Sequence, residues 1–112
     1  MKQLIPRKFE RKRFVGDAVL RPLAHGAPMA AQVFDLAQSG LAAFVGQSLP
    51  VGQLVEVTFR VGQPAVQVGL EKRAGRVVRN RAHPDGNVVG IAFAEPLQPG
   101  ELQILESNWV RS

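Results

Sequence analysis

A small antiparallel β-barrel with a short C-terminal helix is the fold that this sequence favours. Short β-like runs are separated by glycine and proline through most of the chain, and one of them alternates strictly between apolar and polar residues. No helical period is evident between these runs, whereas parallel βαβ units would need one. With 112 residues, the chain has room for one domain with a single core.

The first half of the chain predicts four strands. They are expected over Ala18–Leu23, Met29–Leu36, Leu41–Val45 and Leu54–Val61. The intervening segments His25-Gly26-Ala27-Pro28, Ala37-Gln38-Ser39-Gly40 and Leu49-Pro50-Val51-Gly52 consist largely of residues that favour turns. In the fourth run the inward face is Val55, Val57, Phe59 and Val61. Its polar residues therefore face outward, as expected of a half-buried strand.

The second half predicts further strands, a hairpin and a helix. Ala65–Arg79 is long enough for one bent strand or two strands, with bulges or bends expected at Gly69 and Gly75. His83-Pro84-Asp85-Gly86-Asn87 predicts a hairpin turn before a strand over Val88–Phe93. Leu102, Leu105 and Trp109 recur at helical spacing. This spacing predicts a helix over about residues 100–110, lying over one open end of the sheet.

The net charge of +5 comes from the first 13 residues. The basic residues there are Lys2, Arg7, Lys8, Arg11, Lys12 and Arg13, against the single acid Glu10. Basic and acidic residues cancel over the rest of the chain. We therefore expect a flexible basic arm over residues 1–13 and a single barrel domain over residues 14–112. A cationic arm on a neutral body suits the capture of an anion, because arginine pairs with phosphates and with the O6/N7 edge of guanine.

The composition also argues against several classes of protein. Cysteine is absent, which removes disulfides, thiolate catalysis and cysteine-ligated metals. No apolar stretch is long enough to span a bilayer, and the N-terminus lacks the apolar region of a signal peptide, so a cytoplasmic protein is expected. No nucleophile, acid–base pair or set of metal ligands can be assembled. We expect no enzymatic activity, no metal and no cofactor.

Two short motifs carry the functional information. Arg7-Lys8-Phe9-Glu10-Arg11 is an Arg-x-x-x-Arg pair, and Asp35-Leu36-Ala37-Gln38-Ser39-Gly40 leads a carboxylate into a tight turn. With the later Gly75-Arg76-Val77-Val78-Arg79 and Gly90-Ile91-Ala92-Phe93, their order resembles the PilZ domain family over about residues 7–93. The resemblance implies a six-stranded antiparallel split barrel that binds the bacterial second messenger cyclic di-GMP.

The resemblance also implies which residues bind this ligand. Arg7 and Arg11 would contact guanine and phosphate, Asp35 would hydrogen-bond a guanine edge, and Gly40 would close the turn. Supporting positions would be Lys8, Arg13, Ala37, Ser39 and Arg76. The family has a serine where this chain has Ala37, and losing one hydrogen bond to a charged ligand costs roughly 1.5–3 kcal/mol. Ser39 is shifted by two positions and should point elsewhere on the turn.

Two further points concern the arginines. Glu10-Arg11-Lys12-Arg13-Phe14 is similar to the same family opening displaced by four residues, which would pair Lys12 with Gly16, or Arg11 with Val15. That register leaves no second arginine, so the pair Arg7 and Arg11 is favoured. On the strand before the hairpin, Arg76 and Arg79 lie three residues apart. Simple alternation therefore expects only one of them to face outward.

The leading hypothesis is a non-enzymatic receptor or adaptor that binds cyclic di-GMP and relays its occupancy to an unidentified effector protein. One alternative keeps the fold without the ligand, as a degenerate protein-interaction module, and is motivated by Ala37. Another is a small barrel that binds nucleic acid non-specifically through its basic arm. An aromatic content of 6%, with no tyrosine, argues against a base-stacking surface. No specific nucleic acid is expected as a partner.

Overall fold

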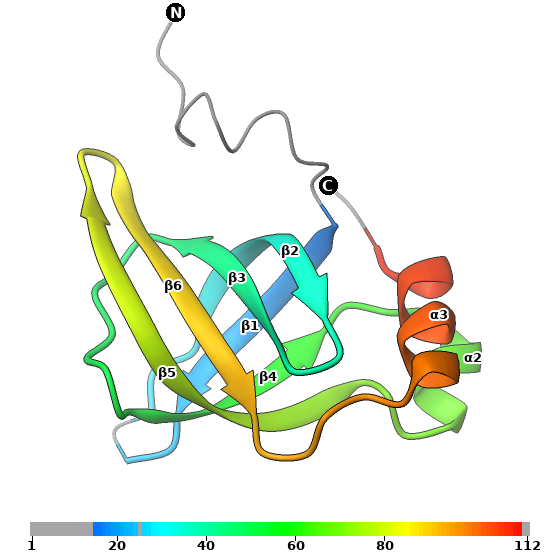
Figure 1. The fold of residues 1–112 in the computed structure, drawn as a ribbon. Coiled ribbons are helices and arrows are strands. Elements are labelled where there is room, and N and C mark those ends of the chain that lie inside the picture. Colours follow the sequence, from blue (N-terminus) through cyan, green and yellow to red (C-terminus); the bar gives the residue numbers. More distant parts are fainter. Residues whose placement is uncertain (1–14, 25, 111–112) are drawn as a thin grey trace, which may run out of the picture.

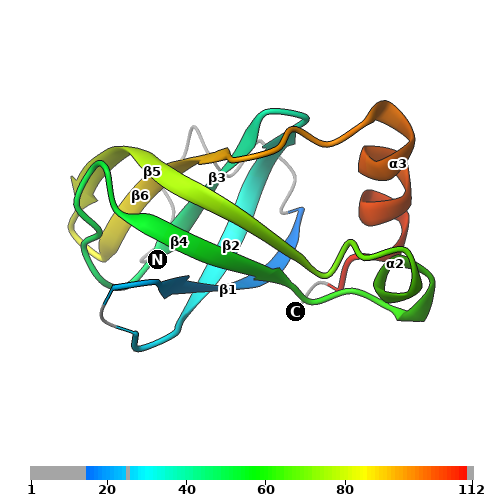
Figure 2. The same cartoon turned by 90° about the horizontal axis from the view of Figure 1, so that it is seen from below.

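Six antiparallel strands close into a barrel, and two short helices lie together at one of its ends (Figures 1 and 2). The computed structural model describes residues 15–24 and 26–110. The strands are β1 (Gly16–Pro22), β2 (Met29–Ala37), β3 (Gly40–Val45), β4 (Leu54–Phe59), β5 (Lys72–His83) and β6 (Gly86–Phe93). The helices are α2 (Gln63–Gln67) and α3 (Pro99–Asn108). The predicted all-β barrel with a short C-terminal helix is confirmed.

The strands follow one another around the barrel in the order β1-β2-β3-β6-β5-β4, and β4 pairs back onto β1. Each of these six strands is therefore hydrogen-bonded on both sides. The core lies inside the ring and is built from alternate residues, as the pattern of β4 predicted. Val55, Val57 and Phe59 of β4 are buried, and so are Val89 and Ile91 of β6. The barrel wall thus separates an apolar interior from an outward face.

The segment between β4 and β5 differs from the prediction. A strand was expected from Ala65 onward with no helix between strands, but α2 occupies Gln63–Gln67 and β5 begins only at Lys72. Pro64 suits the first turn of a helix, because its φ is already helical and its missing N–H would have no partner there. Gly69 lies in the loop after α2 with φ +78°, where a residue with a side chain would be strained. Gly69 is therefore a turn residue, not a strand bulge.

The expected bulge at Gly75 is also wrong. Gly75 pairs regularly with Val55 and with Phe93. The irregularities in the barrel lie elsewhere, between Val77 and Arg79 on β5 and between Val33 and Asp35 on β2.

Helix α3 and the residue that follows it close one end of the barrel. Leu105 of α3 is fully buried, and Trp109, just beyond the helix, is 7% exposed. The indole Nε1 of Trp109 donates a hydrogen bond of 2.6 Å to the main-chain oxygen of Asp17 on β1. Its ring meets Phe59 edge-to-face, with 5.0 Å between the centroids. The apolar spacing predicted for the terminal helix is therefore packing against the core.

Neither α2 nor α3 is long and apolar enough to cross a membrane, and no other helix lies within residues 15–24 and 26–110. Over the same ranges, no three histidine, aspartate or glutamate side chains come together in a way that could hold a metal ion.

Candidate functional site

A shallow depression lies on the outward face of β2, β3, β6 and β5. Its volume is about 260 Å³. It is lined by Asp35, Ala37, Ser39, Gly40, Leu41, Ala42, Val78, Arg79, Gly90, Ile91 and Ala92. The outward residues of the two middle strands, Ala42, Gly90 and Ala92, have small side chains or none. The hollow exists because these residues leave the sheet uncovered between the longer side chains of β2 and β5.

Strand register brings a carboxylate and a guanidinium onto one row. Asp35 on β2 pairs with Ala42 on β3. Ala42 pairs in turn with Gly90 on β6, and Gly90 with Arg79 on β5. Neighbouring strands lie about 4.8 Å apart, so the backbones of β2 and β5 are separated by about 14 Å. The row is an acidic wall and a basic wall with a floor of small residues between them.

Two bulges set this arrangement. Register shifts between Val33 and Asp35, and again between Val77 and Arg79. On β5 the extra residue is Val78, and after it the alternation of side chains restarts. Arg76 and Arg79 are consequently both exposed. They pair with Ala92 and Gly90, which lie two apart on β6 and so share a face. The expectation that only one of these arginines faces outward is wrong.

The charged groups of the two walls have no partner among residues 15–24 and 26–110. Among the described residues, neither the Asp35 carboxylate nor the Arg79 guanidinium makes a hydrogen bond or ion pair. The guanidinium lies over the floor, with its Nε 3.5 Å from where a Cβ would stand at Gly90. Arg21, Arg60 and Arg73, by contrast, are paired with acids. The depression thus offers an acceptor and a donor group that no described neighbour occupies.

The turn between β2 and β3 forms one end of the depression. Ala37 and Gly40 are paired, with Gln38 and Ser39 as the loop. A Cβ at Gly40 would collide with the main-chain oxygen of Ile91, so strand packing itself requires glycine at this position of the motif. Ala37 and Ser39 are exposed, and Phe93 N donates to Ser39 O at 2.9 Å.

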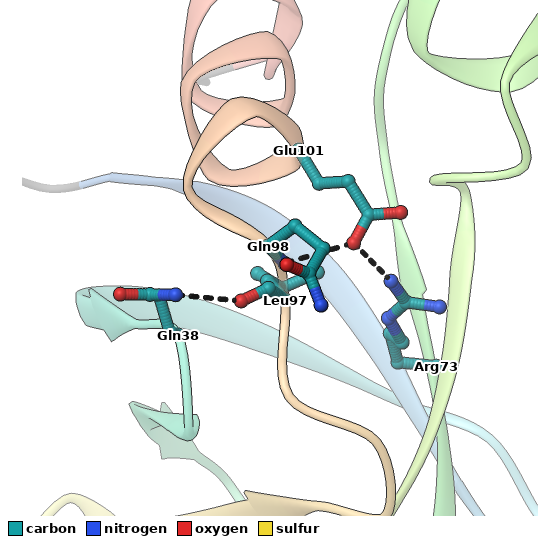
Figure 3. Close-up of polar contacts among 5 residues, drawn as sticks. All are labelled: Gln38, Arg73, Leu97, Gln98 and Glu101. Carbon is teal, nitrogen blue, oxygen red and sulfur yellow. Dashed lines mark hydrogen bonds and ion pairs between the residues drawn. The ribbon is translucent and has the colours of Figure 1, made fainter.

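The same turn is tied to the start of α3 (Figure 3). The main-chain N–H of Leu97 donates to the main-chain oxygen of Gln38 at 2.8 Å. Gln38 Nε2 donates back to the main-chain oxygen of Leu97 at 2.9 Å, as Figure 3 shows. Glu101 accepts from the Gln98 main-chain N–H at 2.9 Å and pairs with Arg73 at 3.1 Å. These bonds hold the turn and the helix to one another and to β5.

The predicted arm residues Arg7, Lys8, Arg11 and Arg13 lie outside the described residues. The described chain begins beside the acidic wall, because Val15 N donates to the oxygen of Val33, two residues before Asp35. The displaced register of the arm motif would use position 16. A Cβ at Gly16 would collide with the Trp109 indole, so this position has no room for a side chain that reaches a ligand.

Several predicted positions are brought together. Asp35, Gly40, Ala37 and Ser39 line the depression, and Arg76 faces outward beside it without lining it. Arg79 lines it and was not among the predicted ligand positions. Its only signal in the sequence is its place at the end of Gly75-Arg76-Val77-Val78-Arg79, because nothing in the residue types marks the bulge.

The chain matches a known protein family. A model of the PilZ domain matches residues 6–108, which include the whole Arg7–Arg11 motif, all six described strands and helices α2 and α3. A search of curated proteins returned no match. The six-stranded closed barrel, with the Asp35–Gly40 turn at the edge of its outer depression, agrees with this match. The chain therefore belongs to the PilZ domain family.

Proposed function

We propose that this PilZ domain is a non-enzymatic cytoplasmic receptor that binds cyclic di-GMP in the outer depression and relays its occupancy to a protein partner. The family as a whole implies ligand-binding adaptors of this kind. The observation that carries the proposal for this chain is the row from Asp35 to Arg79, whose charged groups pair with no described residue, across a floor of small residues.

The chemistry of the row matches a guanine nucleotide. A carboxylate at Asp35 can accept from the N1 and N2 donors of guanine, while the Arg79 guanidinium can donate to O6 and N7 or to a phosphate. The small side chains of Ala42 and Ala92 let a flat ring approach the sheet beside the Arg79 guanidinium, which lies over Gly90. Asp35 and Arg79, which pair with no described residue, therefore favour a ligand that carries donors at one side and acceptors at the other.

The arm is long enough to complete such a site. Arg11 is four residues before Val15, and an extended chain spans at most about 3.5 Å per residue, giving a reach of about 14 Å. That reach equals the spacing of about 14 Å between the β2 and β5 backbones. Arg7 lies four residues further out. Both arginines can therefore reach a ligand held over the floor, with Lys8 and Arg13 adding positive charge.

Isothermal titration of the full chain with cyclic di-GMP, beside GTP, tests the proposal. We expect saturable binding of cyclic di-GMP and no comparable heat with GTP. Arg7→Ala, Arg11→Ala and Asp35→Ala should each weaken binding about tenfold or more, since a hydrogen bond to a charged group contributes about 1.5–3 kcal/mol. A flat trace at high micromolar ligand would overturn the proposal.

Matched variants separate the depression from general charge. Arg79→Ala should weaken binding, whereas Arg81→Ala should not, because Arg81 is exposed on the same strand but lies outside the depression. Glu106→Ala, which removes an exposed acid from α3, is the control for Asp35→Ala. Equal losses in Arg79→Ala and Arg81→Ala would mean that nucleotide contacts the barrel only through diffuse positive charge.

A second candidate function retains a specific observation in its favour. Ala37 lines the depression, and it lacks the hydroxyl of the serine found at this position of the family motif. If no nucleotide binds, the domain acts as an interaction module through its outer surface. A flat titration of the wild-type chain that becomes saturable in Ala37→Ser would identify this case.

A further inference from the structure

A second hollow lies beside the first, on the outward face of β4, β5 and β6. It is a groove of about 440 Å³. Its lining residues are Leu23, Leu54, Ala74, Gly75, Arg76, Val78, Ala92, Phe93 and Ala94. Val78 and Ala92 line both hollows. The groove is therefore a separate surface that shares one wall with the candidate nucleotide site.

The groove is apolar in a way that the core does not explain. Leu23 and Leu54 are each 47% exposed and Val78 is 49% exposed, at the rim. Between them the floor is small, with Ala74 and Ala92 facing outward. A run of large exposed apolar side chains around a flat floor is typical of a surface that is covered by another molecule.

The shape of the groove favours a helix as its occupant. The main-chain N–H of Leu23 donates to the main-chain oxygen of Leu54 on β4. Leu54 pairs with Arg76 on β5, which pairs with Ala92 on β6, so the groove crosses β4 and β5 towards β6. From Leu23, just after β1, across β4 and β5 to β6 is three strand spacings, so the groove is about 14 Å wide. A helix with its side chains is about 10–12 Å across. At the groove, Leu54 of β4 pairs with Arg76 of β5, and Arg76 pairs with Ala92 of β6, so a partner strand has no free edge to extend there. A partner must dock through side chains.

The charge at the groove selects the partner. Arg76 lies at its wall, exposed, and makes no ion pair or hydrogen bond through its side chain with any described residue. We propose that the groove receives an amphipathic helix of a partner protein. Apolar residues of that helix would cover Leu54 and Val78, and a carboxylate on it would pair with Arg76.

Two other occupants fit less well. The arm of this chain carries six basic residues, which would repel Arg76, and the described chain begins at Val15, at the opposite end of β1 from Leu23. A second copy docked groove to groove about a two-fold axis would bring two Arg76 side chains towards one another without supplying a carboxylate from the groove. Both arguments favour a partner that brings its own acid.

The shared wall suggests how docking connects to nucleotide binding. Because Val78 and Ala92 line both hollows, a helix seated in the groove lies beside a ligand in the depression. This link rests on the proposed function, whereas the groove itself does not. The docking test is therefore made without nucleotide, so that a flat nucleotide titration and a failure of docking are separate results.

The probe is a phage-displayed library of 16-residue peptides selected on the full chain. We expect enriched peptides with apolar residues at helical spacing and a nearby Asp or Glu. The affinity of the chain for a labelled enriched peptide is measured by fluorescence polarisation. It should fall at least tenfold in the variants Leu54→Lys and Arg76→Glu. Val51→Lys is the control, because Val51 is 64% exposed in a turn outside the groove. Its affinity should stay within twofold of wild type.

A charge exchange completes the test. A peptide whose acid is replaced by lysine should bind Arg76→Glu better than it binds wild type, and this recovery shows that the variant is folded. Thermal melts of Leu54→Lys and Val51→Lys should coincide with wild type. The proposal is overturned if no peptide is enriched, or if Leu54→Lys binds as wild type does. It is equally overturned if the wild-type chain forms a dimer that Leu54→Lys dissociates, since a second copy would then fill the groove.

Discussion

The hydroxyl missing at position 37 can be restored by one substitution, Ala37→Ser. Ala37 is exposed at the lip of the depression, two residues from Asp35 on the same strand, so both side chains point outward. A serine there has room, and surface substitutions of this kind change the free energy of unfolding by about 0.5 kcal/mol at most. Any effect on ligand binding would therefore come from the new hydrogen bond.

The size of that effect follows from exposure. A hydrogen bond to a charged group contributes about 1.5–3 kcal/mol, and the lower value applies at an exposed lip. Since about 1.4 kcal/mol is a factor of ten, Ala37→Ser should bind cyclic di-GMP about tenfold more tightly than wild type. Isothermal titration of both proteins under the same conditions measures this difference directly.

Ser39→Ala is the control for this prediction. Ser39 uses its main-chain oxygen to accept from Phe93, and this bond does not need the hydroxyl. Its affinity for the nucleotide should stay within twofold of wild type. If Ser39→Ala loses tenfold while Ala37→Ser gains nothing, the hydroxyl at position 39 already serves the ligand, and the reasoning from the motif position is refuted.

Three further predictions concern the elements that hold the site, each measured by urea denaturation. Trp109→Ala should lower the free energy of unfolding by about 3–5 kcal/mol, because a buried indole and its contacts are lost; a loss below about 1 kcal/mol would mean that the end of the barrel is closed by other groups. Gly40→Ala should lower it by about 1–3 kcal/mol through overpacking against Ile91, whereas a neutral result would show that β3 and β6 can separate there. Glu101→Ala should lower it by about 1–2 kcal/mol through loss of its bond to the Gln98 main-chain N–H and of its ion pair with Arg73. The exposed Glu106→Ala should change little, and equal effects would contradict this role of Glu101.

Much of the barrel could be predicted because its signals are local. Alternating apolar residues identified β4, and glycine and proline marked the turns around it. Helix α2 was missed for a related reason: five residues are too few to show a helical period. Its buried Ala65 belongs to the hydrophobic core, and the helix packs against α3.

The site was harder to predict because it depends on register. Asp35 and Gly40 could be found from a motif within six residues. Arg79 could not, since it joins them only through pairings across β3 and β6 and through the extra residue Val78. A bulge depends on how two strands pair, and no residue type in Val77-Val78-Arg79 predicts one.

The closed ring of strands also affects the rate at which the chain folds. Neighbouring hairpins such as β5–β6 form from residues close in sequence, but β3 must find β6 and β1 must find β4 across long intervening segments. The entropy of closing such loops is lost before the contacts form. Barrels of this kind fold in milliseconds to seconds, whereas helical bundles fold in microseconds to milliseconds. The last pairing to form completes the ring. Until then two strand edges carry unpaired N–H and C=O groups, with which another chain can pair.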